Sequence, residues 1–111
     1  MKYLKNIQPY EVNNLKEIVS STGKKIASKA IIDNEHTEIR FFSFAEWEDI
    51  DKEYYEKETI FIVIVGSLKV LYNEKDELIV NEGEMVCLES DINYGVKALK
   101  ACKVCNILVK P

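Results

Sequence analysis

The chain has 111 residues, enough for one compact domain that buries roughly 60–70% of its unfolded surface and too few for two separate cores. It carries 15 basic and 19 acidic residues for a net charge of −4, and no basic stripe suited to a nucleic-acid backbone is present. No apolar run is long enough to span a bilayer, and the N-terminal residues lack the features of a secretory signal. The three cysteines are an odd number, which does not indicate a framework of disulfides. We therefore expect a cytoplasmic protein with reduced thiols and with neither a membrane nor a nucleic acid as partner.

The pattern along the chain predicts one short helix followed by many short strands. Val12, Leu15 and Ile18 recur at helical spacing, and Gly23 is suited to end that helix. From residue 25 the apolar period changes to two, and the acidic stretch 46–53 is expected to be a connection. The predicted strands cover residues 25–33, 37–44, 60–65, 67–72, 77–81, 84–88, 94–99 and 103–110. Short strands separated by turns indicate an all-β barrel or sandwich, so we predict an N-terminal segment over 1–24 and a barrel over 25–111.

The predicted strand 60–65 has no polar residue on either face. A half-exposed strand alternates between apolar and polar side chains, so both faces of this strand are expected to be covered. One face would look into the barrel. The other would be covered either by the N-terminal segment or by a second subunit, and we favour a homodimer.

The glycine and strand spacing resembles that of the cupins, in particular small single-domain bacterial cupins of the conserved-barrel, RmlC-like group. The run that ends at Gly66 and the turn at Gly83 resemble the anchors of the two cupin motifs, and the likeness extends over residues 25–109. It implies a cupin-type double-stranded β-helix, a jelly-roll barrel, preceded by one short helix. It also places the four metal-ligand positions of the family at Glu53, Tyr55, Thr59 and Tyr94, none of which is a histidine.

Strand parity predicts a pocket inside this barrel. Thr59, Phe61 and Val63 are two residues apart and share one face, and an extended segment before them would put Glu53 and Tyr55 on the same face. The predicted ligand pocket is therefore largely aromatic and apolar, with the carboxylate at its mouth; its residues are Glu53, Tyr55, Thr59, Phe61, Val63 and Tyr94. Trp47 is expected either to close over the barrel mouth as a lid or to pack at a subunit contact.

No metal or other cofactor is predicted. His36, the one histidine, follows a polar turn and is expected to be solvated, while phenol and hydroxyl groups are poor ligands at neutral pH. The acidic stretch 49–58 could offer oxygen ligands to a hard cation, with Glu53 first, but interleaved lysines favour a solvated surface. Cys102 and Cys105 form a Cys-x-x-Cys match expected to be structural, and Cys87 is expected in the core.

The leading hypothesis is a metal-free, non-catalytic or sensor-type domain that binds a small apolar or aromatic molecule in the barrel. The alternative is a cupin enzyme of the isomerase or oxygenase type that uses an unusual carboxylate and tyrosine site, in which burial would raise the pKa of Glu53. A third possibility is a structural domain whose apolar 60–65 face docks on another protein.

Overall fold

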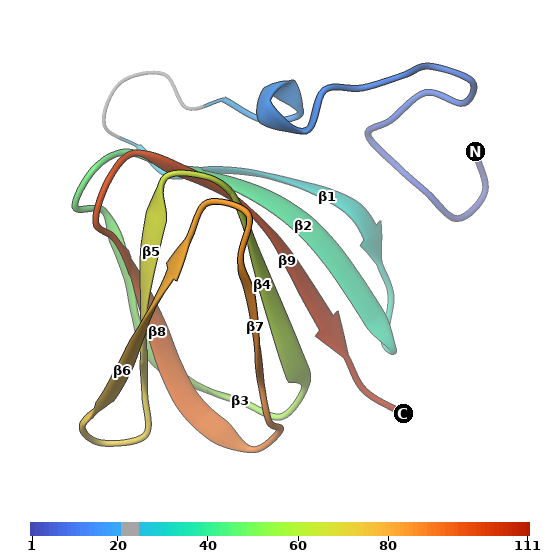
Figure 1. Cartoon of the computed structure of the whole chain (residues 1–111). Coiled ribbons are helices and arrows are strands. Elements are labelled where there is room, and N and C mark those ends of the chain that lie inside the picture. Colours follow the sequence, from blue (N-terminus) through green and yellow to red (C-terminus); the bar gives the residue numbers. More distant parts are fainter. Residues whose placement is uncertain (21–24) are drawn as a thin grey trace.

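The computed structural model describes residues 1–20 and 25–111, and its strands form two facing antiparallel sheets (Figure 1). Sheet A has the strand order β1-β2-β9-β4-β7, and sheet B has the order β3-β8-β5-β6. The strands are β1 (Ala27–Asp33), β2 (Thr37–Phe44), β3 (Asp49–Tyr55), β4 (Glu58–Val65), β5 (Ser67–Tyr72), β6 (Asp76–Asn81), β7 (Met85–Leu88), β8 (Ile92–Ala98) and β9 (Cys102–Val109). The all-β class and the two-sheet jelly-roll predicted from the sequence are confirmed.

The core lies between the inner faces of the two sheets. Leu68 and Val70 of β5 face Val63 of β4 and Val104 of β9, and all four side chains are fully buried. Alternate residues of each strand point into this layer, as the period of two requires.

The stretch 46–53 was expected to be a connection, and this prediction is wrong from Asp49 onward. These residues form β3, an edge strand of sheet B that pairs with β8 through a register shift between Ile50 and Glu53. Five of its seven residues are exposed, which hides the apolar alternation that identifies a strand. Its backbone pairs all the same, because an edge strand needs hydrogen bonds on one side only.

The N-terminal segment lies outside the two sheets (Figure 1). The expected short helix is present as a single 3₁₀ turn, η1 (Leu15–Glu17), whose start is capped by the Asn14 side chain. Earlier in the segment, the backbone N–H of Lys5 donates to the carbonyl of Ile31, which covers part of the edge of β1. Gly23, the predicted end of the helix, lies outside the described residues. Among residues 1–20 and 25–111, no helix is long and apolar enough to cross a membrane.

The apolar 60–65 stretch has two different faces. Phe61 and Val63 point into the core and are buried, whereas Ile60 and Ile62 lie on the outer face of sheet A and are half-buried. Part of this outer face is covered within the chain, since η1 packs against β4. The N-terminal segment therefore covers part of the outer face of sheet A. Apolar surface remains beside it, so a second subunit stays a prediction for the rest of this face.

Candidate functional site

A cavity of about 180 Å³ lies in the barrel interior and is bounded by both sheets. It sits on the side where β3 forms the edge of sheet B and β1 forms the edge of sheet A, with no backbone pairing between these strands to close the barrel. The lining residues come from β2, β3, β4, β8 and β9; they are Glu38, Phe42, Phe44, Ile50, Tyr55, Phe61, Tyr94, Gly95, Val96, Asn106 and Leu108. We refer to this space as the barrel cavity.

Five of the eleven residues that line the barrel cavity are aromatic. Tyr55 and Tyr94 stack with their ring centroids 4.2 Å apart and an interplanar angle of 21°, and the Phe61 ring meets Tyr94 edge-on at 5.8 Å. Phe42 and Phe44 stack on each other on β2, with centroids 5.6 Å apart. Offset stacks and edge-to-face contacts are the favourable arrangements of such rings, so the wall is held in place by its own side chains.

The hydroxyl of Tyr94 is tied to a buried partner. Its oxygen lies 2.8 Å from Thr59 Oγ1, and Thr59 has 0% of its surface exposed. Burial raises the pKa of Tyr94 to about 12, against which the hydrogen bond with Thr59 acts. Burial, followed by the nearby Glu53 carboxylate, also raises the pKa of Tyr55. Both phenols are therefore neutral at physiological pH and serve as hydrogen-bonding groups rather than as charges.

Two polar residues of the barrel cavity were not identified from the sequence. Glu38 on β2 lines the cavity with its side chain 20% exposed, and its charge is among the lesser causes of the raised pKa of Tyr94. Asn106 on β9 is buried and donates through Nδ2 to the carbonyl of Ile60 at 3.2 Å. The alternation of β2 would have identified Glu38, because it shares the inner face with Phe42 and Phe44.

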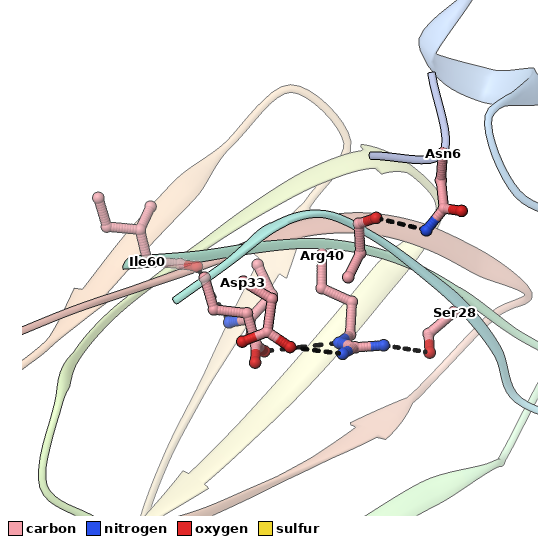
Figure 2. A network of polar contacts seen from close by, with 8 residues as sticks. Asn6, Ser28, Asp33, Arg40 and Ile60 are labelled. Atoms are coloured by element: carbon pink, nitrogen blue, oxygen red, sulfur yellow. Dashed lines mark hydrogen bonds and ion pairs between the residues drawn. The ribbon is translucent and has the colours of Figure 1, made fainter. Parts of the chain in front are cut away.

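Arg40, which shares the inner face of β2 with Glu38 and Phe42, is not among the residues that line the barrel cavity. Its guanidinium donates to Ser28 Oγ at 3.1 Å and lies 3.9 Å from the Asp33 carboxylate, a network that Figure 2 shows. Its Nε is 3.5 Å from Glu38 Oε2. One guanidinium thus serves two carboxylates, and this group of three residues keeps a net negative charge.

A second, larger hollow lies at the end of the sheets where the β5–β6 hairpin meets β4 and β7. Its volume is about 620 Å³, and it is open to the surface. Thr59 lines it, while the hydrogen-bond partner of Thr59, Tyr94, lines the barrel cavity. This bonded pair therefore forms part of the wall between the two spaces.

The predicted pocket residues fall into two groups. Tyr55, Phe61 and Tyr94 line the barrel cavity together, whereas Val63 is sealed in the core beyond it. Glu53 is exposed, and the Tyr55 hydroxyl donates to it at a long 3.5 Å. Glu53, predicted as a pocket residue at the mouth, is not among the lining residues and lies beside the Tyr55 hydroxyl.

Trp47, the predicted lid, lines neither space. It stands on the loop before β3 with 60% of its surface exposed and φ +71°, and Lys97 Nζ lies 5.7 Å from its ring.

The cysteines and the histidine are dispersed over the molecule. His36 is exposed, as expected. The expectation that Cys87 belongs to the core is wrong, because it lies on the outer face of β7 opposite Ile60 and is exposed. Cys102 is buried at the start of β9, and burial raises its pKa to about 11, which fits a structural thiol.

The residues at the metal positions of the cupin motifs do not fit a transition metal. Thr59 and Tyr94 bond to each other, and the raised pKa of Tyr94 keeps its phenol protonated. Across residues 1–20 and 25–111, no group of three or more His, Cys, Asp or Glu side chains comes together in a way that could hold a metal ion. Thr59 and Tyr94 therefore offer protonated hydroxyl groups rather than metal ligands.

Comparison with known proteins shows which solved structures share this fold. No protein-family model matches the chain, and no curated protein matches it. Among solved structures, a conserved protein of unknown function from Streptococcus pyogenes superposes with a TM-score of 0.94 at 20% identity, covering 100% of this chain and 96% of that chain. A cupin superfamily protein from Desulfitobacterium hafniense DCB-2 gives a TM-score of 0.90 at 17% identity, covering 97% and 98%.

A cupin 2 conserved barrel domain protein from Leptotrichia buccalis gives a TM-score of 0.88 at 19% identity, covering 97% of this chain and 51% of that chain. These likenesses define the class: the chain is a β-barrel with the cupin fold. Because the barrel hosts many unrelated functions, its particular role has to be argued from the site.

Proposed function

We propose that the protein binds a small molecule with an aromatic or apolar ring in the barrel cavity. The observation that carries this proposal is the cavity itself, a partly open space in the barrel interior whose wall includes stacked and edge-on aromatic rings. Small barrels are often filled completely by their own side chains. Here the side chains of Phe61, Tyr55 and Tyr94 form part of the wall and leave the cavity between them and the other lining residues unfilled.

The size of the cavity sets the size of the ligand. An apolar cavity of about 150 Å³ in another protein holds one benzene molecule. The barrel cavity, at about 180 Å³, therefore has room for one ring with a short substituent. The very best ligands of this size reach about 1.5 kcal/mol per non-hydrogen atom, which for about seven atoms is about 10 kcal/mol. An unoptimised ring is expected to fall short of this ceiling and to bind in the micromolar to millimolar range.

Titration of the protein with toluene and p-cresol, followed by protein-observed NMR, tests this proposal. We expect shifts concentrated on β3, β4 and β8. The variant Leu108→Phe should weaken binding at least tenfold because the larger ring takes up cavity space, while Ile79→Phe, on the exposed outer face of sheet B, should not. Absence of binding, or equal binding to both variants, would contradict the proposal.

We further propose that the chain forms a homodimer through the outer face of sheet A, in a reducing compartment such as the cytoplasm. The half-buried Ile60, Ile62 and Ile107 lie side by side on this face, and all three cysteines are free thiols. Light scattering should give twice the chain mass for the native protein and for Ile79→Asp, and a monomer for Ile62→Asp. A native monomer at micromolar concentration would overturn this proposal.

The second candidate function is an enzyme that uses a carboxylate and a tyrosine. It is favoured by one observation, that Glu38 and the protonated Tyr94 line the same cavity, as an acid–base pair would. Exchange of the α-protons of phenylacetone in D₂O, followed by NMR, distinguishes this function from binding alone. Catalysed exchange that is lost in Glu38→Gln or Glu53→Gln would establish an enzyme, and exchange at the buffer rate would exclude this chemistry.

A further inference from the structure

We infer that the ligand of the barrel cavity carries a protonated amine, and that Glu38 receives this amine while the aromatic wall holds the ring. This inference rests on the proposed binding function and specifies the chemical class of its ligand. It follows from three properties of the cavity: the hydrogen-bonding capacity that its polar residues leave free, the sign of the charge, and the aromatic wall.

The polar atoms of the cavity are mostly acceptors. The Glu38 carboxylate has only acceptor oxygens, and one of them, Oε2, faces Arg40 at 3.5 Å. The Asn106 amide donates to the Ile60 carbonyl, which leaves its oxygen as an acceptor. The tyrosine hydroxyls are engaged as well, Tyr94 with Thr59 and Tyr55 with Glu53. A ligand that bonds to the free oxygens of Glu38 and Asn106 has to bring hydrogen-bond donors.

Most of the donors closest to the cavity already have partners. Arg40 holds the one guanidinium near it, and its N–H groups point to Ser28, Asp33 and Glu38. One of the two N–H groups of the Asn106 amide donates to the backbone of β4. A ligand carboxylate would therefore meet Glu38 without a free cation to pair with, and placing two like charges in a partly buried site is unfavourable.

The charged groups around the barrel cavity carry a net negative charge. Glu38, Asp33 and Arg40 together carry one net negative charge, and Glu53 adds a second carboxylate at the margin beside Tyr55. Burial is the main cause of the raised pKa of Tyr94, and the charge of Glu38 adds to it as a lesser cause. A cation that enters the cavity is attracted both by these carboxylates and by the negative faces of the aromatic rings.

Three probes with one ring and different head groups test the inference: benzylamine, benzyl alcohol and phenylacetate, titrated at pH 7 and followed by protein-observed NMR. We expect benzylamine to bind most tightly and phenylacetate at least tenfold more weakly. Glu38→Gln should weaken benzylamine about tenfold and leave benzyl alcohol unchanged. Glu35→Gln, an exposed carboxylate in the turn before β2, is the matched control and should change neither.

The possible results separate this inference from the proposal beneath it. Binding of all three probes with equal affinity, or tightest binding of phenylacetate, would overturn the amine while leaving ring binding intact. Binding of none of the three would overturn both. If Glu38→Gln does not fold, the ranking of the three probes on the native protein still decides, because that ranking needs no variant.

Discussion

Gly66 is the position where a single methyl group should damage the barrel most. This residue joins β4 to β5 with φ +88°, a conformation that costs a residue with a side chain about 1–2 kcal/mol. An added Cβ would also lie 2.3 Å from the carbonyl oxygen of Ala101 and 2.7 Å from Cys102 Cβ. Carbon and oxygen normally approach to about 3.3 Å, so the two segments would have to separate by about 1 Å.

The neighbouring segment cannot move away without loss. Cys102 begins β9, the central strand of sheet A, which pairs with both β2 and β4. Displacing packed backbone of this kind costs about 1–3 kcal/mol, so Gly66→Ala should lose about 2–5 kcal/mol in total. That is a large part of the roughly 5–15 kcal/mol of stability expected for a domain of this size.

Gly83→Ala is the matched control. Gly83 has nearly the same backbone conformation, φ +83°, but an added Cβ there would meet no atom within 4 Å. It should therefore lose only the conformational part, about 1–2 kcal/mol. Urea unfolding followed by far-UV circular dichroism measures both losses, and the difference between the variants isolates the clash. If Gly83→Ala were destabilised as much as Gly66→Ala, the reasoning from close approach would be refuted.

Four further predictions concern the barrel cavity and the thiols. Gly95→Ala would place a Cβ 2.6 Å from the Ile50 carbonyl oxygen, so β3 should be pushed outward, with calorimetry showing lower stability and NMR weaker ring binding; unchanged binding would contradict this. Tyr94→Phe should cost about 1–3 kcal/mol in urea unfolding at pH 7 because the Thr59 hydroxyl loses its partner, and adding Thr59→Val should recover part of the loss. The pKa of Tyr94 is about 12 when folded and about 10 when unfolded, so the native stability should fall between pH 10 and 12, and less steeply in Tyr94→Phe. Iodoacetamide followed by peptide mass spectrometry should label the exposed Cys87 in the folded protein and Cys102, 2% exposed, only after unfolding; equal labelling would contradict the burial.

Much of the fold follows from local patterns in the sequence. The period of two marks most of the strands, and turns at Gly66 and Gly83 fix where they reverse, since both need a positive φ that glycine adopts freely. Side-chain parity also puts Phe61 on the inner face of its strand. These properties depend only on neighbours along the chain, and for that reason they could be predicted.

The edge strand β3 shows where local patterns fail. Its residues are mostly charged and exposed, so nothing in its apolar alternation distinguishes it from a loop. Its pairing with β8 across about forty positions of sequence makes it a strand, and the close approach of β3 at Gly95 allows that pairing.

What the sequence determined by itself is the kind of surface inside the barrel: aromatic, without histidine, and built on alternating strands. The tertiary structure decided which of those side chains meet. Glu38 on β2 is far in the chain from Tyr94 on β8 and Asn106 on β9, and only the order β2-β9-β4 in one sheet and β3-β8 in the other brings the three to one cavity. The physical reason is that parity sets the direction of each side chain within its own strand, whereas the packing of the two sheets sets what it faces.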